Sequence, residues 1–369
     1  MGGSAHPEVD PGPRPSHPAG APTPARRPDG GRHDGRAQAL TVVLPLRLGG
    51  RTGLAAWLWV LRRRRLRGFA VGTLDSLRFV SAIRWSLLPP FHPPGRWPWR
   101  RSPDERWQLL FESSFDGDWD DYLEVFGAVQ GWPLRTITAW GSGWPGLDDL
   151  RLFKAYAKAA DHEPDHYVSA YPSLTSGDVF QELMARDPRR ARSTARRHGL
   201  GLDHPSWTTL LLPLVEGRAA AAVRAARALE DPPDGGEPVL VRTGLVHFGR
   251  VVVLDRPTGS WLLVTLTHDG TAEEVLAAAV AADRHLGPTA PGGSTTLRRL
   301  VECTEGAPDP SEGWWDDADL TAHLLAARPA ASRHHMAYCG YAGSTVAAVR
   351  DLAARPRRHA TWPVREPRR

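Results

Sequence analysis

Side chains that could carry acid–base chemistry gather in the second half of this 369-residue sequence. His247 and Arg250 lie three residues apart in the segment Val246-His-Phe-Gly-Arg-Val-Val-Val253. In an extended strand, side chains three residues apart project from opposite faces, so we expect only one of the two to face a given cavity. His247 and Arg250 are therefore candidate catalytic residues. A buried structural histidine is the more frequent role for a residue such as His247.

Two Asp-Gly pairs end hydrophobic runs, at Asp116–Gly117 and at Asp269–Gly270. Their carboxylates could act as proton shuttles if they reached the mouth of a cavity, so Asp116 and Asp269 are further candidate catalytic residues. Aspartate followed by glycine also makes tight turns, and a negative charge is favourable beside a helix N-terminus. The structural role is the alternative that we keep open for both.

Two histidines are candidates for holding a cofactor. His268 or His335 could supply an axial imidazole to haem iron. His334 and His335 are adjacent, and neighbouring strand residues point to opposite faces, so they are not expected to chelate one metal together. The sequence has no HExxH, clustered CxxC or EF-hand pattern, and a recognisable zinc or calcium motif is therefore absent.

The elements that must position these residues occur twice. Four segments recur in the same order: Thr41–Leu46 as Thr209–Leu214, Leu77–Arg84 as Val246–Val253, Trp107–Gly117 as Ser260–Gly270, and Tyr167–Tyr171 as Ala337–Tyr341. This alignment places Arg78 and Ser81 opposite His247 and Arg250, so the two halves do not carry the same site. Repetition in a constant order predicts a tandem duplication.

Each copy reads strand, helix, strand, strand, helix, strand. The sequence predicts an α+β fold in which a ferredoxin-like βαββαβ unit is duplicated in tandem. The expected divisions are a disordered arm rich in Pro, Gly and Arg (1–38), a first repeat with a Pro/Trp-rich insertion (39–200), a second repeat (201–355) and a basic tail (356–369).

Alternation along the strands predicts which faces are buried. Leu262, Val264 and Leu266 lie on one face of their strand and should meet helices. Glu112 and Thr265 lie on the opposite, more polar face of the matching strands, which could line a cavity. Thr271 has the spacing of a helix capping box.

The βαββαβ order, the aromatic-rich second strand and the strand that ends in Asp-Gly resemble the dimeric α/β-barrel superfamily. In that superfamily, two ferredoxin-like antiparallel sheets face each other around a shared cavity. Phe115-Asp116-Gly117 and His268-Asp269-Gly270 resemble the Asp-Gly of the GxxDG motif of dye-decolorising peroxidases, although Ser113 and Leu266 replace its first glycine. The resemblance implies an uncharacterised branch with a pseudo-dimeric barrel, a small-molecule cavity between the repeats, haem and peroxidase-like oxidoreductase activity. The alternative is a non-catalytic module that binds a small molecule or a protein partner.

Composition narrows the remaining classes. The net charge of +5 comes almost entirely from arginine, because the only lysines are Lys154 and Lys158, and no nucleic-acid-binding motif accompanies it. We therefore expect no specific nucleic-acid partner. The apolar run over residues 54–61 is too short to span a bilayer and predicts a buried helix. With two cysteines and no apolar leader, the sequence predicts a cytoplasmic protein without a transmembrane segment.

Overall fold

The computed structural model describes residues 33–34, 37–61, 79–93, 101–129, 131–186, 205–230, 232, 234–287, 294–307, 316–333, 335–340 and 344–353. The strands are β1 (His33–Asp34), β2 (Ala37–Pro45), β3 (Val80–Leu88), β4 (Gln108–Asp116), β5 (His166–Ser169), β6 (Ser206–Pro213), β7 (Val246–Arg256), β8 (Gly259–His268) and β9 (His335–Cys339). The helices are α1 (Gly50–Leu61), α3 (Trp119–Val129), α4 (Gly131–Thr138), α5 (Leu150–Ala160), α6 (Ser176–Arg186), α8 (Ala219–Ala228), α9 (Val239–Arg242), α10 (Ala272–His285), α11 (Thr296–Val301), α12 (Asp317–Ala326) and α13 (Val346–Ala353), with the 3-10 turns η2 (Pro103–Glu105) and η3 (Ala330–Arg333).

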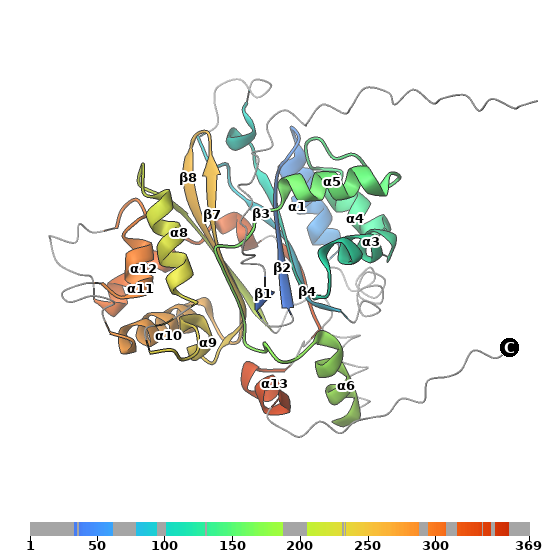
Figure 1. The fold of residues 1–369 in the computed structure, drawn as a ribbon. Helices are drawn as coiled ribbons and strands as arrows, with labels where there is room; N and C mark the ends of the chain where they lie inside the picture. Colours follow the sequence, from blue (N-terminus) through green and yellow to red (C-terminus); the bar gives the residue numbers. More distant parts are fainter. Residues whose placement is uncertain are drawn as a thin grey trace, which may run out of the picture.

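Two antiparallel sheets face each other at the centre of the protein (Figure 1). The first sheet has the strand order β1-β2-β4-β3-β9, and the second has the order β5-β7-β8-β6. Helices α1, α3, α4 and α5 cover the outer side of the first sheet, and α8 to α12 cover the outer side of the second (Figure 1). The fold is therefore mixed α+β with antiparallel sheets, as the sequence predicts.

The chain crosses from one sheet to the other twice. After α5, Asp161 bridges to Val42 in β2, and the chain then enters β5, which pairs with β7 of the second sheet. After α12, the carbonyl of Ala327 accepts a hydrogen bond from the Leu211 amide in β6, and the chain then enters β9, which pairs with β3 of the first sheet. Each crossing segment thus joins the two sheets along one edge.

The strand register corrects part of the sequence alignment. Irregularities in pairing fall between Val80 and Ala82 in β3 and between Val246 and Phe248 in β7, so the extra residues are Ser81 and His247.

Counted from these bulges, His247 corresponds to Ser81, and Arg250 corresponds to Arg84. The alignment that paired His247 with Arg78 and Arg250 with Ser81 is wrong by three residues. Similarity between short apolar runs does not fix a register, whereas the hydrogen-bonded ladder does. Arg78 itself lies outside the described residues, as do Trp97 and Trp99 of the insertion.

The first sheet also extends into the expected arm, residues 1–38. His33–Asp34 form β1, which pairs with residues 37–38 of β2, and Ala37 and Gln38 pair in turn with Asp116 and Phe115 at the end of β4. The ladder extends because β4 offers an edge along its full length. The other expected arm residues before position 33, and the tail from 356, lie outside the described residues.

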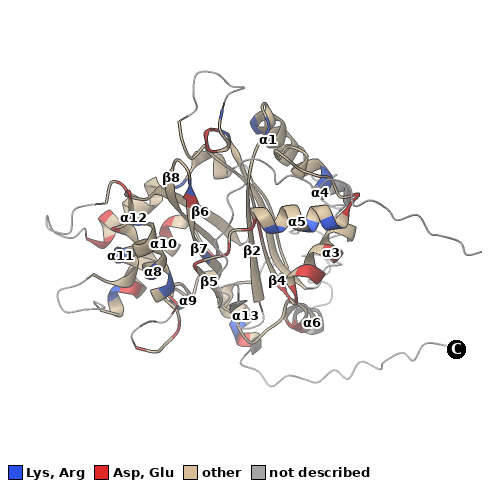
Figure 2. Cartoon of the chain, turned by 45° about the horizontal axis from the view of Figure 1, so that its top comes forward, with Lys and Arg blue, Asp and Glu red and all other residues tan. Residues whose placement is uncertain are grey.

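The outer faces of the sheets confirm the predicted alternation. Leu262, Val264 and Leu266 of β8 belong to the apolar cluster shared with α8 and α10. Thr271 forms the expected capping box with Glu274 at the start of α10. Charged side chains lie mainly on the outer helices and loops (Figure 2).

The expected buried helix is α1, in which Leu54, Leu58 and Leu61 are buried against the first sheet. Among the residues that the structure describes, no helix is long and apolar enough to cross a membrane.

Between the sheets, two apolar clusters lie on either side of a polar layer. One cluster includes Val43, Leu110, Val252 and Leu263. The other combines strand residues such as Phe248 with residues of α6 and α13, which lie together at one end of the sheets (Figure 1). These two helices therefore close one end of the space between the sheets.

Candidate functional site

His247 and Asp269, two of the predicted site residues, are in direct contact. His247 Nε2 lies 3.0 Å from Asp269 Oδ1, and His247 Nδ1 lies 2.5 Å from the hydroxyl of Tyr171. The bulge in β7 brings the imidazole to the end of β8, where Asp269 follows the last strand residue. The result is a hydrogen-bonded chain of hydroxyl, imidazole and carboxylate, which we call the Tyr171–His247–Asp269 relay.

Asp269 extends this relay to a helix. Its Oδ2 accepts a hydrogen bond of 2.7 Å from the amide of Val346, the first residue of α13. Tyr171 lies between β5 and α6. The relay therefore links the approach to α6 with the start of α13. Sequence reasoning missed Tyr171, although a tyrosine ends both copies of its segment, at positions 171 and 341.

Asp116 holds the corresponding place beside the first sheet. Its Oδ2 accepts a hydrogen bond of 2.6 Å from the amide of Ser176, the first residue of α6. At the position that corresponds to His247, the hydroxyl of Ser81 contacts the hydroxyl of Ser176. Both aspartates thus bind helix N-termini, but of α6 and α13 rather than of the helices that follow them in sequence. These two helices fold back over the end of the sheets, so their free amides reach the Asp-Gly turns.

The relay has the order in which a base activates a nucleophile, since a hydroxyl contacts an imidazole that is oriented by a carboxylate. Its burial decides what it can do. The Tyr171 side chain is 2% exposed and His247 is fully buried, whereas the Asp269 side chain is 14% exposed. A dissolved substrate would reach only the carboxylate, so the relay is better suited to holding α13 than to attacking a substrate.

The histidines do not fit haem. Both ring nitrogens of His268 are engaged, because Nε2 lies 2.9 Å from Thr208 Oγ1 and Nδ1 lies 3.0 Å from the Asp269 carbonyl oxygen. Burial lowers the pKa of His268 to about 4, so this ring is neutral at pH 7. Both nitrogens of His247 are also engaged. Neither residue can ligate iron without losing one of these hydrogen bonds.

His335 lies apart from these two histidines. It is the first residue of β9 and pairs with Ser86, well away from the Asp-Gly ends of the sheets. Its Nδ1 contacts the carbonyl oxygen of Ser332 at 3.1 Å. The predicted cofactor residues are therefore not brought together. Within the described ranges, no group of three or more His, Cys, Asp or Glu side chains is placed to hold a metal ion.

Arg250 lies in a separate place, the polar layer between the sheets. Each sheet contributes one row of paired residues to this layer. The row in the first sheet is Thr41, Glu112, Arg84 and Ala337. The row in the second sheet is Thr209, Thr265, Arg250 and Tyr167. We call these two rows the central layer. The predicted polar face of β4 and β8 does face inward, and its side chains contact each other across the two sheets.

Arg250 reaches from the second sheet to the first. Its Nη2 donates to the Ser113 carbonyl oxygen and to Ser114 Oγ, each at 2.6 Å, and its Nη1 donates to Glu112 Oε1 at 3.3 Å. Thr265 also donates to Glu112 from the second sheet. Arg250 thus acts as a clamp between the sheets.

The central layer buries three charged groups. Arg84, Glu112 and Arg250 are 1%, 2% and 5% exposed. Arg84 Nη1 lies 3.7 Å from Glu112 Oε2. Burial lowers the pKa of Arg84 to about 10, an effect opposed by Glu112 and reinforced by Arg250. Because removing an ion from water costs on the order of several kcal/mol, such a layer needs internal partners.

A groove opens on the outer side of the first sheet, with a volume of about 670 Å³. Its walls come from α1, η3 and the strand ends, and its lining residues are Arg51, Thr52, Ala55, Ala56, Leu87, Trp107, Ala330 and Ala331. The Arg51 guanidinium lies over the Trp107 ring, 4.3 Å from the ring centroid. We call this the α1–η3 groove. No motif in the sequence marks it, because α1 and η3, which form its two walls, lie far apart in the sequence.

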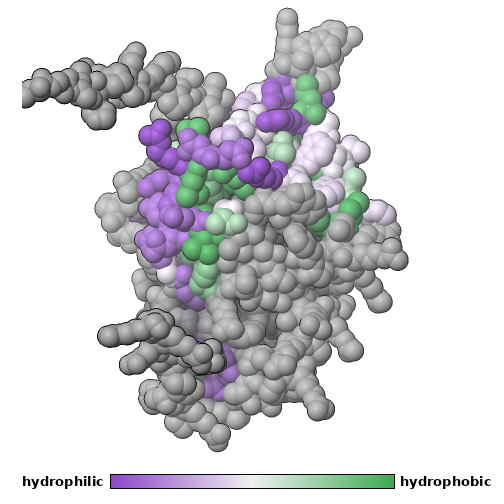
Figure 3. Space-filling model, turned by 90° about the vertical axis from the view of Figure 1, so that its right-hand side faces the viewer, coloured by the Kyte–Doolittle hydropathy of each residue, from purple (hydrophilic) through white to green (hydrophobic). Residues whose placement is uncertain are grey.

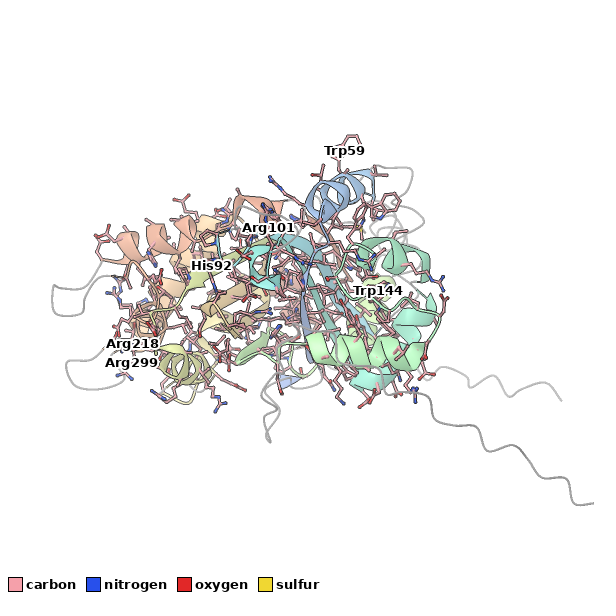
Figure 4. The ribbon with its side chains drawn as sticks, turned by 90° about the horizontal axis from the view of Figure 1, so that it is seen from above. Trp59, His92, Arg101, Trp144, Arg218 and Arg299 are labelled. Atoms are coloured by element: carbon pink, nitrogen blue, oxygen red, sulfur yellow. The ribbon has the colours of Figure 1, made fainter. Side chains whose placement is uncertain are left out.

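Helix α1 also carries an exposed aromatic side chain on its outer side. Trp59 is 55% exposed and points away from the protein (Figure 4). On the side of the molecule that carries α3, α4 and α5, hydrophobic and hydrophilic residues are interspersed (Figure 3).

No protein-family model and no curated protein matches this sequence. The assignment of function therefore rests on the geometry alone.

Proposed function

We propose that the chain is a tandem duplication of a ferredoxin-like unit, arranged as a pseudo-dimeric α/β barrel, and that it binds a small molecule in the α1–η3 groove. The duplication is supported by the bulges at Ser81 and His247, by the crossings through β5 and β9, and by the matching rows of the central layer. Asp116 and Asp269 add a further correspondence, since each accepts the first amide of a helix.

The observation that carries the binding function is the volume and composition of the groove. Small-molecule sites are clefts of roughly 300–1,000 Å³ with a mostly apolar lining and a few polar groups. The groove has about 670 Å³, and most of its lining residues are apolar. One wall, α1 with Trp107, comes from the first unit, and the other, η3, comes from the second. A ligand would therefore contact both units.

The chemistry of the lining indicates the class of ligand. Trp107 offers a flat apolar surface, and Arg51 places a positive charge over it. Among the described residues, no carboxylate lies within ion-pair distance of Arg51. The ligand that complements this lining has a flat apolar body and one carboxylate.

The experiment is a calorimetric titration with 1-naphthoate, with the neutral alcohol 1-naphthalenemethanol as the matched probe. We expect 1-naphthoate to bind more tightly than the alcohol, and Arg51→Gln to weaken its binding by about fivefold, because an exposed charge contributes about 1 kcal/mol. Ala55→Phe fills the groove and should abolish binding of both probes.

Arg218→Gln is the control, since Arg218 precedes α8 on the opposite side of the molecule (Figure 4). It should bind both probes as the unmodified chain does. Unchanged binding in Ala55→Phe would place the ligand elsewhere and refute the proposal. The haem-dependent peroxidase-like activity expected from the resemblance receives no support from these residues and stays a prediction.

A further inference from the structure

Only the first turn of α1 is polar on the side of the helix that faces solvent. That side carries Arg51 and Thr52, followed by Ala56 and Trp59. Trp59 is 55% exposed and points away from the protein (Figure 4). Leu48, in the turn before α1, is also 55% exposed. A surface helix normally turns charged or polar residues to water, so the apolar outer side of α1 calls for a partner that covers it.

The charge around α1 is positive. Residues 35–74 contain eight arginines and no aspartate or glutamate, and all four positions that follow α1 in the sequence, 62–65, are arginine. Helix α4 and strand β9 contact α1, and neither of them has an acidic residue. The turn η3, across the α1–η3 groove, has none either. The partner that complements this side of the protein is therefore both apolar and negatively charged.

We propose that the outer side of α1 docks on an anionic lipid surface, with Trp59 and Leu48 in the interfacial region and the arginines against the lipid headgroups. Tryptophan concentrates at membrane–water interfaces, and arginine is attracted to anionic lipids. A helix that lies in the plane of the interface buries its apolar face by roughly 5–10 Å. Docking of this kind requires no helix that crosses the membrane. It is also independent of ligand binding in the α1–η3 groove, because Trp59 and Leu48 do not line that groove.

A second copy of the chain is the alternative occupant, and the charge argues against it. Packing α1 of one copy against α1 of another would bring the arginines of both copies to one interface. Like charges that face each other across an interface oppose association. An anionic lipid surface neutralises the same arginines, so the charge favours the membrane.

The test is co-sedimentation of the full chain with vesicles, made either of phosphatidylcholine alone or of an equimolar mixture with phosphatidylserine. We expect binding to the mixed vesicles only, and weaker binding at high salt, because salt screens the attraction between arginine and the surface. Trp59→Ser should weaken binding about tenfold, since the exposed part of the indole no longer becomes buried in the interface. Val125→Ser is the matched control and should bind as the unmodified chain does, because Val125 is 41% exposed but lies on α3.

A fluorescent label gives a second measurement that keeps Trp59 in place. Both cysteines of the chain are buried, so Leu48→Cys and Val125→Cys can each be labelled at the new thiol with nitrobenzoxadiazole. Emission of the label at position 48 should shift to shorter wavelength with the mixed vesicles, and emission of the label at position 125 should not.

Three results would overturn the proposal. The first is equal binding of the unmodified chain to both kinds of vesicle, and the second is equal binding of Trp59→Ser and the unmodified chain, or an unshifted label at position 48. The third is a dimer that forms without vesicles and is lost in Trp59→Ser, because a second copy would then cover this side of α1.

Discussion

Replacing Asp269 by alanine should destabilise the protein more than replacing Asp116. Both aspartates accept the first amide of a helix, from Val346 in one case and from Ser176 in the other. Asp269 also holds Nε2 of His247, which is fully buried. The corresponding residue beside Asp116 is Ser81, whose hydroxyl contacts another serine. The two substitutions therefore differ in whether a buried imidazole loses its partner.

The magnitudes follow from these contacts. Loss of a side-chain acceptor at a helix start costs about 1 kcal/mol, so we expect a loss of this size for Asp116→Ala. A buried polar group left without a partner adds about 1–3 kcal/mol, which gives about 2–4 kcal/mol for Asp269→Ala. In the double variant His247→Phe with Asp269→Ala, the loss should be smaller than the sum of the two single losses, because no imidazole nitrogen remains to be satisfied; the Tyr171 hydroxyl loses its contact with His247 Nδ1 in both variants that carry phenylalanine.

The assay is urea unfolding at pH 7 followed by tryptophan fluorescence, with hydrogen exchange of α13 measured in parallel. Asp269→Ala should lower the protection of the first amides of α13 more than Asp116→Ala does. Equal losses of unfolding free energy for the two single variants would refute the reasoning. The reasoning would also be refuted if the double variant lost as much unfolding free energy as the sum of the losses in Asp269→Ala and His247→Phe.

Two further predictions concern the histidines. Burial lowers the pKa of His166 to about 4, so between pH 6.5 and pH 4 the unfolded chain binds a proton that the folded chain does not, and stability falls as pH falls. At pH 5, His166 alone accounts for a loss of about 2 kcal/mol in the free energy of unfolding. The free energy of unfolding of His166→Leu, measured in urea, should therefore change less between pH 7 and pH 5 than that of the unmodified chain. If titration with hemin gives a Soret band, the band should be unchanged in His247→Ala and in His268→Ala. A band that is lost in either variant would identify that histidine as an axial ligand and contradict the geometry.

Local features could be predicted because their signals are local. The capping box at Thr271 and the burial of Leu54 and Leu58 follow from spacing within one or two helical turns. The inward position of Glu112 and Thr265 follows from the two-residue alternation of a strand. The recurrence of short segments predicts the order strand, helix, strand, strand, and the described elements run in that order from β2 to β4 and, with α9 added, from β6 to β8.

The candidate site was only partly predictable. His247 and Asp269 were chosen by residue type, but nothing in their spacing of 22 residues requires contact. Tyr171 joins them from 76 residues away. The spacing of Arg250 and His247 predicts that they face opposite ways, and the register places Arg250 in the central layer with Glu112, 138 residues away. Contacts over such distances depend on which strand edges pair.

The sequence by itself determined the α+β class, the buried helix over residues 54–61, the capping box at Thr271 and the buried face of β8, because these depend on interactions among residues a few positions apart. Only the tertiary structure decided that β5 and β9 cross to the opposite sheets, that bulges shift the register at Ser81 and His247, and that α1 meets η3 to form a groove. Alternating hydrophobicity determines which face of a strand is buried, but it does not determine which other strand pairs with it. The pairing is selected by the packing of the whole chain.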